Sequence, residues 1–458
     1  MLLWFRNDLR THDNPALHHF MSIRSSSSPG KAIFFISEKQ WQIHDWSPIK
    51  IDFILRHAHD LVAQLAQLDI TLELIKVPDF SAQVTYLKKY CLTHNIQEVI
   101  ANSEVEFNEQ TRDQACIDQG ISLTLFESDV IAPKGKILNK SGEMFKVFTP
   151  FKRAWLHHIK TFGFDYLGKP ILNTVAADTQ SKAPSLSSGW PLATDYEKHT
   201  LGTFFQDKLI NYQQDRDMPF IKGTSGISPY LAAGVISPRY VLRALQHRSP
   251  DILLAIDSPE FAWLNEIIWR DFYRHLMYHQ QKLCKHQCFN SKYDAVHWLN
   301  NESLFNAWCQ GKTGYPLVDA AMRQLNQTGW MHNRLRMVVA SFLTKHLLID
   351  WRKGEKYFMQ HLIDGDLAAN NGGWQWAAST GCDAQPYFRI FNPIRQSERF
   401  DPKGEFIRKY IPELVDIPNK DIHFPHGYIK KNGIERYWPA IVDHKTAREN
   451  ALAFYKVL

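Results

Sequence analysis

Four side chains on one predicted helix could together hold a flat ligand with a polar rim. Trp263, Glu266, Arg270 and Tyr273 follow one another at intervals of three and four residues, so a helix brings them to one face. A core stripe is normally aliphatic, and a solvated face carries few rings. This mixture favours a pocket that stacks a planar ring, with ordinary packing as the alternative for this segment alone.

A second predicted helix turns Asn333, Arg336 and Met337 toward one side, with Arg334 next to them in the sequence. Arginines do not enter a helix core without partners, because an unpaired buried charge is very costly. The segment 364–374 supplies the carboxylates that we expect to pair with them.

That segment carries its own pattern of polar and aromatic residues. Asp366, Asn370 and Trp374 are spaced by four, and Gly372 and Gly373 permit close backbone approach. Together with the arginines, they could bind the donor and acceptor edge of an isoalloxazine ring.

The common phosphate-binding motifs are absent. Residues 311–313 read Gly-Lys-Thr like the end of a P-loop, but Asn306 stands where the first glycine must be. No G-x-G-x-x-G follows the first predicted strand, so we expect the α/β part to hold no dinucleotide in the usual way.

Metal binding is not expected either. Cys284, His286 and Cys288 lack the second ligand pair that a zinc or iron-sulfur site needs. His275 and His279 lie four apart on one helix without the glutamate of H-E-x-x-H, so packing or surface roles are favoured.

The elements that position these residues fall into two kinds. Short apolar runs alternate with amphipathic segments at 2–5, 32–36, 71–77, 98–101 and 122–126. Asn14 before Pro15 and Ser47 before Pro48 mark helix starts. This βαβ repetition predicts a doubly wound parallel sheet over residues 1–130.

The remainder is expected to be helical. Gly, Pro, Ser, Thr and Ala dominate 163–202, which predicts an interdomain linker that we place at 131–200. Beyond it, residues 201–458 show helical periodicity with few strand signals. The clearest helices are predicted at 261–276, 316–325, 334–347 and 356–362.

Bulk composition narrows the class of protein. Lys and Arg number 53 against 47 Asp and Glu, a net charge of +6 that is compatible with a polyanion partner. Six scattered cysteines indicate free thiols in a reducing compartment. No run approaches the roughly 18 apolar residues of a membrane span, and no signal core begins the chain. We therefore expect a soluble, cytoplasmic protein, and a monomer.

Several long motifs resemble the photolyase and cryptochrome family. They are the opening Trp4–Asn14, the segments 311–325 and 364–376, and residues 406–414. The likeness covers nearly the whole chain, and it is closest to class I cyclobutane pyrimidine dimer photolyases of the folate-antenna type.

The resemblance implies FAD bound in bent form in the helical domain, active when reduced. The residues implied to bind it are Tyr212, Thr224, Ser225, Gly226, Ile227, Ser228, Trp263, Arg270, Asn333, Arg336, Asp364, Gly365 and Asp366. Arg336 is expected to pair with Asp364. Asn370 is expected near flavin N5, where an amide suits the reduced flavin. Gly226 departs from the family, which often has a basic residue there, so backbone amides would have to contact the phosphates.

The resemblance also implies light-driven repair of DNA dimers that are flipped out of the duplex. The residues implied to contact DNA or the lesion are Arg216, Glu266, Trp269, Asn333, Arg334, Met337 and Trp376. Glu266 would stabilise the pyrimidine radical anion. Trp298, Trp351 and Trp374 match the family's electron-transfer chain, with packing as the alternative for any one of them. Asn108 and Glu109, with Cys284 and Lys285 nearby, match the site of a 5,10-methenyltetrahydrofolate antenna.

Other readings have weaker support in these residues. A 6-4 photolyase is expected to show a histidine pair, but Asn333 follows His332. A plant-type cryptochrome is expected to have an acid at position 370 and a C-terminal extension, whereas this sequence has Asn370 and ends at Leu458. A blue-light receptor without repair activity remains the main alternative, and Glu266 speaks against it. An ordinary flavoprotein oxidoreductase lacks a nicotinamide fingerprint.

Overall fold

A five-stranded parallel sheet organises the N-terminal part of the chain. The structure is a computed structural model that describes residues 1–24, 29–170 and 185–456. The strands are β1 (Leu2–Phe5), β2 (Gly30–Ile36), β3 (Ile70–Lys76), β4 (Val99–Asn102) and β5 (Leu123–Phe126), in the order β3-β2-β1-β4-β5. Leu3 of the central strand pairs with Ala32 on one side and Ile100 on the other. The predicted doubly wound sheet is confirmed.

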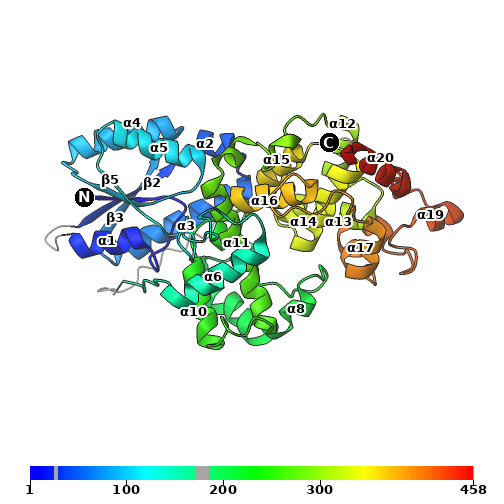
Figure 1. Ribbon diagram of the computed structural model, residues 1–458, viewed down its shortest axis with the longest axis horizontal. Coiled ribbons are helices and arrows are strands. Elements are labelled where there is room, and N and C mark those ends of the chain that lie inside the picture. The colour runs from blue at the N-terminus through cyan, green and yellow to red at the C-terminus, as the bar shows by residue number, and fades with distance from the viewer. Residues whose placement is uncertain (25–28, 171–184, 457–458) are drawn as a thin grey trace. The chain divides into compact units, whose positions relative to one another are not determined.

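Helices cover both faces of this sheet. They are α1 (Pro15–Ile23), α2 (Glu38–Ile43), α3 (Pro48–Ala66), α4 (Phe80–Thr93) and α5 (Phe107–Asp118). Figure 1 shows α4 and α5 on one side of the sheet and α1 and α3 on the other. The predicted caps are present, because Asn14 Oδ1 accepts from Leu17 N at 3.1 Å and Ser47 Oγ accepts from Lys50 N at 3.2 Å.

The compact unit that contains the sheet extends beyond it, to residues 1–209 and 225–284. Its further helical elements are α6 (Phe148–Phe162), α7 (Ala193–Asp195), η1 (Tyr196–Leu201), η2 (Phe204–Lys208), α9 (Ser228–Ala232), α10 (Pro238–Arg248) and α11 (Pro259–His279), while η3 (Leu209–Asn211) and η4 (Gln281–Lys285) cross its limits. Buried Asp271 of α11 joins that helix to α6 and to residues 131–132, because its carboxylate accepts from Ile131 N at 3.0 Å, Ala132 N at 3.2 Å and Trp155 Nε1 at 2.9 Å. Burial raises the pKa of Asp271 to about 6, against the lowering effect of these donors.

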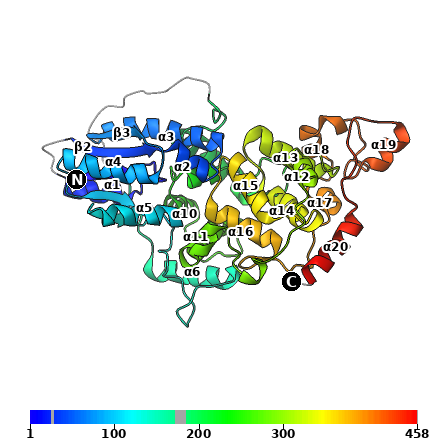
Figure 2. The same cartoon turned by 90° about the horizontal axis from the view of Figure 1, so that it is seen from above.

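The second compact unit, residues 210–224 and 285–458, is helical wherever the structure describes regular elements. They are α8 (Tyr212–Asp215), η5 (Ser291–Tyr293), α12 (Glu302–Cys309), α13 (Pro316–Thr328), α14 (Asn333–Ser341), η6 (Phe342–His346), α15 (Trp351–His361), α16 (Leu367–Ala378), α17 (Pro393–Phe400), α18 (Glu405–Tyr410), η7 (Pro412–Leu414), α19 (His426–Asn432) and α20 (His444–Lys456). Helix α16 packs against α14 and α15, as Figure 2 shows.

The segment that resembles a P-loop has a structural role in this unit. Buried Asp319 accepts from Thr313 N and Thr313 Oγ1, both at 2.6 Å, and from Gly314 N at 3.0 Å. Tyr437 Oη and Trp438 Nε1 donate to the same carboxylate at 2.7 and 2.8 Å. Asp319 of α13 therefore holds residues 313–314 and the C-terminal segment around Tyr437 in place.

The expected elements are largely present, with one difference. The helix predicted at 334–347 is α14 followed by η6, a turn with the wider π-helical hydrogen bonding. The domain limits at 130 and 200 stay a prediction. Within the expected linker, α6 is a regular helix, and 171–184 lie outside the described residues.

Two further expectations concern the chemistry of the whole chain. The six cysteines form no disulfide in the part of the chain that the structure describes. Among the described residues, no helix combines the length and apolar character needed to cross a membrane.

Candidate functional site

Trp263 on α11 is held by the loop that precedes α9. Its indole is buried, and Nε1 donates to Ser225 Oγ at 3.2 Å. The rings of Phe204 and Phe205 each lie 5.4 Å from it. The Ser225 carbonyl accepts from Tyr196 Oη at 2.9 Å. The loop of residues 224–228 is thus fixed to the helix that carries the predicted ring-stacking residues.

Gly226 in this loop has a φ of +69°, a conformation that glycine adopts without strain. A β-carbon there would lie 3.7 Å from Trp190. Backbone geometry therefore favours glycine at this position.

Farther along α11, Trp269 stacks on Phe148 with ring centroids 3.6 Å apart and planes 7° from parallel. Half-buried Glu266 lies one turn before Arg270, and its Oε1 is 3.5 Å from Asn265 Nδ2. The four residues 263, 266, 270 and 273 share one helix, as predicted, and of these Trp263 alone is fully buried.

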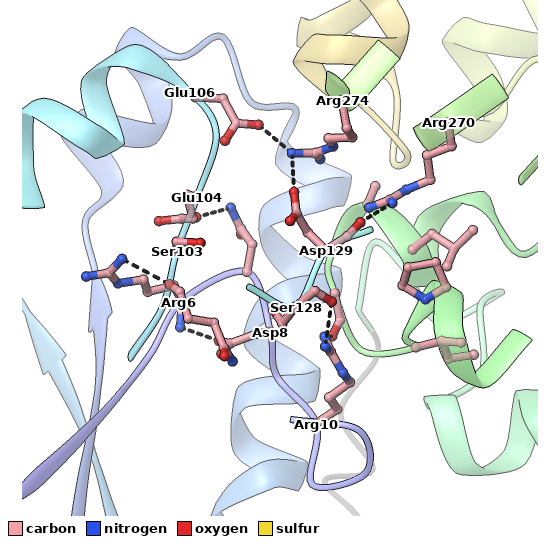
Figure 3. Close-up of a pocket in the computed structure, with 17 residues that line it drawn as sticks. Arg6, Asp8, Arg10, Ser103, Glu104, Glu106, Ser128, Asp129, Arg270 and Arg274 are labelled. Carbon is pink, nitrogen blue, oxygen red and sulfur yellow. Dashed lines mark hydrogen bonds and ion pairs between the residues drawn. The ribbon is translucent and has the colours of Figure 1, made fainter. Parts of the chain in front are cut away.

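A polar pocket lies where the strand order of the sheet reverses. Strands β1 and β4 are neighbours whose connections leave in opposite directions, which opens a crevice at their carboxyl ends. Arg6 N donates to Asp8 Oδ1 at 2.6 Å, and Arg10 Nη2 donates to the Ser128 carbonyl at 3.1 Å (Figure 3).

Arg270 reaches this pocket from α11. Its guanidinium donates to the main-chain carbonyl of Asp129, while Arg274 Nη1 donates to Glu106 Oε1 at 2.9 Å (Figure 3). Burial alone would raise the pKa of Asp129, but Lys134 and Arg274 lower it well below its usual range. Four arginines and four carboxylates line the pocket, so its charges balance. This balance favours a rigid ionic network over an anion site.

In the helical unit, the predicted pairing of Arg336 with Asp364 is present. Arg336 Nη2 lies 2.8 and 3.0 Å from the two oxygens of buried Asp364, and Nε donates to the Met331 carbonyl at 2.8 Å. Arg334 differs from the expectation, because its partner is Asp217 at 2.6 Å rather than a residue of 364–374. Both arginines thus have the carboxylate partners that burial requires.

Asp366 and Asn370 lie one turn apart at the start of α16. Asp366 caps the helix, with Oδ1 accepting from Ala369 N at 2.9 Å. Asn370 Nδ2 donates to the Glu355 carbonyl at 2.9 Å. This bond fixes the amide and leaves Oδ1 as an acceptor on its other side. Asn333, at the start of neighbouring α14, is exposed.

The three tryptophans of the expected electron chain share one hydrophobic core. Trp298 is 8% exposed, Trp351 0% and Trp374 2%. The indole N–H groups of Trp298 and Trp374 have no hydrogen-bond acceptor among the described residues, and Trp351 lies beside the thiol of Cys288. An oxidised indole at Trp374 would therefore keep its proton.

Gly354 makes room for Trp374 between α15 and α16. A β-carbon at Gly354 would lie 2.2 Å from Cη2 of that indole. At Gly354, the ring of Trp374 therefore packs directly against the backbone of α15, the helix that begins at Trp351.

Asn108 and Glu109 meet a third residue, His44, which the sequence did not suggest. Asn108 Nδ2 and Gln40 Nε2 both donate to His44 Nε2, at 3.0 and 2.9 Å. The ring proton of neutral His44 therefore sits on Nδ1, which lies 3.5 Å from Glu109 Oε1. Cys284 is close enough for Glu109 to raise its pKa, to which burial contributes most.

His44 and Glu109 do not form an ion pair. Burial raises the pKa of Glu109 to about 8, with help from Glu106 and Glu104, and burial lowers the pKa of His44 to about 4. Burial thus favours the neutral form of both groups. A protonated Glu109 has an O–H to donate to a ligand, which an ionised carboxylate lacks.

The remaining predicted residues lie as follows in their own units. Buried Tyr212 faces Arg216, with the guanidinium carbon 5.4 Å from the ring centroid. Half-buried Trp376 lies 6.5 Å from the ring of Phe391. The others are Thr224, Ser228 and Met337, which are half-buried, Ile227 and Gly365, which are buried, and Lys285, which is exposed.

Comparisons with known proteins find similarity to DNA photolyases in both the N-terminal and the C-terminal parts of the chain. A family model described as DNA photolyase matches residues 1–171, and one described as the FAD binding domain of DNA photolyase matches residues 263–457. A Vibrio cholerae protein named deoxyribodipyrimidine photo-lyase is 45% identical, over 99% of this chain and 99% of its own.

Solved structures have the same architecture. A bacterial class III photolyase from Agrobacterium tumefaciens has a TM-score of 0.81 and 35% identity, covering 100% of this chain and 97% of that one. An archaeal photolyase from Sulfolobus tokodaii, solved with two FAD molecules, has a TM-score of 0.79 and 28% identity, covering 100% and 99%. The chain therefore belongs to the DNA photolyase family.

Proposed function

We propose that this protein is a deoxyribodipyrimidine photolyase, which uses light and reduced FAD to split cyclobutane pyrimidine dimers in DNA. The observation that carries the proposal is the full-length similarity to a curated protein of that name. The geometry within each unit adds support, because several side chains assigned to FAD are held in place by hydrogen bonds or ion pairs. Trp263 is bonded to Ser225, Arg336 to Asp364, and Asn370 to the Glu355 carbonyl.

Each unit, taken by itself, has residues whose chemistry suits a flavin. Ser225 is held against Trp263, so that the backbone amides of the loop 224–228 can serve the phosphates where Gly226 offers no side chain. Arg336 and Asp364 form a fixed charged pair, and Asn370 presents Oδ1 as an acceptor. When bound, reduced FAD supplies the light absorption and the electron that opens the cyclobutane ring.

The lesion is assigned to residues that can bind a flipped pyrimidine pair. Enzymes that act on a base inside a duplex take it out of the stack, photolyases among them. Trp269 and Trp376 offer flat apolar surfaces, while Glu266 offers a carboxyl group to the pyrimidine carbonyls. Arg216 and Arg334 are assigned to the DNA phosphates, although Arg334 would have to share its charge with Asp217.

The assignment of Trp374, Trp351 and Trp298 to electron transfer is supported by their common core. An oxidised indole that gives its N–H proton to an acceptor becomes a neutral radical, which holds the oxidation at that ring. Since Trp374 has none among the described residues, the positive charge is free to move outward along the chain.

An antenna chromophore, 5,10-methenyltetrahydrofolate, is assigned to the cluster of His44, Asn108 and Glu109. Neutral Glu109 and the Asn108 amide offer the donor and acceptor pair that a pterin edge recognises. The Sulfolobus tokodaii photolyase was solved with two FAD molecules. The identity of the chromophore that this protein binds must therefore be measured separately, on the purified protein.

A repair assay tests the proposal. Photoreduced protein is mixed with an oligonucleotide that carries one thymine dimer, and then lit with blue light or kept dark. We expect both thymines to be restored in light and neither in the dark. Failure in light would remove the enzymatic function even if flavin were bound.

A further inference from the structure

A lysine is buried in the helical core over the ring of Tyr455, a neighbour of Trp298. Lys345 in η6 is 0% exposed, and its Nζ donates to Ser379 Oγ at 2.8 Å. The same nitrogen lies 3.5 Å above the ring centroid of Tyr455. No ion pair among the described residues includes it, so its charge acts on this ring without neutralisation by a carboxylate.

Tyr455 joins Trp298 to the surface. Its ring centroid lies 6.1 Å from that of Trp298, at an angle of 78°. On its other side, the ring of Tyr387 lies 6.3 Å away and nearly parallel, at 10°. Tyr387 is 36% exposed, whereas Tyr455 is 4% exposed. The three rings form a continuous route from the expected electron chain to water.

The surroundings of Tyr455 oppose its oxidation. Its hydroxyl donates to the Ala378 carbonyl at 3.0 Å, and a carbonyl does not take up the phenolic proton. A cation over an aromatic face is attracted by the neutral ring and repelled by positive charge that develops on it. Burial lowers the pKa of Lys345 to about 7, so the ammonium form dominates at mildly acidic pH.

We propose that Lys345 is a positioning residue that confines the positive charge of photoreduction to Trp298, by blocking electron transfer from Tyr387 through Tyr455. This inference rests on the proposed function, since Trp298 must be the outer member of the chain. With the block in place, oxidised Trp298 is reduced by an external thiol. Without it, Tyr387 gives one electron to Trp298 by way of Tyr455 and releases its phenolic proton to water, leaving a neutral tyrosyl radical.

The test is flash excitation of the flavin in the parent protein, in Lys345→Met and in Lys345→Met with Tyr387→Phe. Transient absorption distinguishes the broad tryptophan radical band from the narrow tyrosyl band. At about pH 6, where Lys345 is protonated, we expect a tryptophan radical in the parent, a tyrosyl radical in its place in Lys345→Met, and a tryptophan radical again in the double variant. Methionine matches the length of lysine, and replacing a buried charge by an apolar group is commonly tolerated.

A pH series on the parent protein gives the same information without a substitution. Between about pH 6 and about pH 9, the tyrosyl signal should grow as Lys345 loses its proton. Ser379 and Tyr455 face the ammonium group of Lys345. The other titratable groups nearby are Asp350, Tyr293 and Cys288, which lie near Tyr455, and the His346–His444 pair. Burial raises the pKa of Tyr455 well above its usual range, and burial lowers those of both histidines, so Lys345 is the group expected to titrate in this window.

The outcomes separate this inference from the function on which it rests. A normal tryptophan radical without a tyrosyl radical in Lys345→Met, or across the pH series, overturns the role of Lys345 alone. A tyrosyl radical of equal yield in the parent near pH 6 overturns it as well. Absence of any tryptophan radical in the parent overturns the electron chain together with this inference.

Discussion

Replacing Gly354 by alanine tests how closely α15 and α16 enclose Trp374. The new β-carbon would lie 2.2 Å from Cη2 and 2.4 Å from Cζ3 of the indole, and 2.7 Å from Leu343 Cδ2. Ordinary contact begins near 3.4 Å, so the ring and the helix must separate by about 1.2 Å, the difference between 3.4 and 2.2 Å. The indole is rigid and buried, and a rotamer change has little room to relieve the overlap.

Two free-energy contributions oppose each other in this variant. Alanine in place of glycine inside a helix stabilises by about 0.5 to 1 kcal/mol. Overpacking a filled core costs about 1 to 3 kcal/mol, and two contacts under 2.5 Å put this site toward the upper end. We expect a net loss of about 1 to 2 kcal/mol in the free energy of unfolding, measured as a lower urea midpoint with unchanged slope.

Gly427→Ala in α19 is the matched control, because a β-carbon there meets no atom within 4 Å. We expect that variant to lose no stability. The displaced indole in Gly354→Ala should also slow flavin photoreduction, followed as the loss of oxidised-flavin absorbance in blue light. A Gly354→Ala protein as stable as the parent, with unchanged photoreduction, would refute the packing argument.

Three other outcomes are expected. Trp298→Phe should slow photoreduction yet leave repair by already reduced protein nearly intact, and loss of both would contradict the electron-chain assignment. Asp364→Asn should lower the flavin-to-protein absorbance ratio and cost about 1.5 to 3 kcal/mol, because a charged hydrogen-bonded pair is lost; Glu413→Gln, which breaks the Arg323 pair of the same unit, should leave the flavin ratio unchanged. Because the pKa of Glu109 rises from 4.5 to about 8 on folding, the folded chain holds a proton that the unfolded chain loses, so stability should fall as pH rises across that window. Glu109→Gln should flatten the curve in a thermal melt series, and an unchanged slope would disprove the buried neutral acid.

The sequence was informative wherever structure depends on neighbours along the chain. Asn14 and Ser47 cap helices because capping needs a donor three residues ahead, which the sequence displays directly. Trp263, Glu266 and Arg270 share a helix for the same reason. The pairing of Arg336 with Asp364 was predicted from the resemblance and from the cost of an unpaired buried charge.

Contacts between segments far apart in the sequence cannot be predicted from residue spacing. Asp217 pairs with Arg334 across 117 positions, and His44 meets Asn108 across 64. Neither partner stands out in its own neighbourhood, because folding rather than spacing brings the groups together. Nothing in the sequence marks Gly354, because the space it leaves is visible only once the indole of Trp374 is in place.

Helix irregularity was also hidden from the sequence pattern. Apolar periodicity over 334–347 predicts one helix, but the chain passes from α14 into the wider turn η6. Such turns are frequent at functional sites. Here the turn carries Lys345, whose burial no periodicity argument would anticipate for a lysine.

Stepwise reconstitution with FAD measures whether flavin bound by this chain performs the repair. Flavin-free protein is loaded with known fractions of FAD, photoreduced, and given single-dimer DNA under blue light. We predict that the number of dimers split per minute rises in proportion to bound FAD and is zero without it. Repair by the flavin-free protein, or none by the fully loaded protein, would contradict the account.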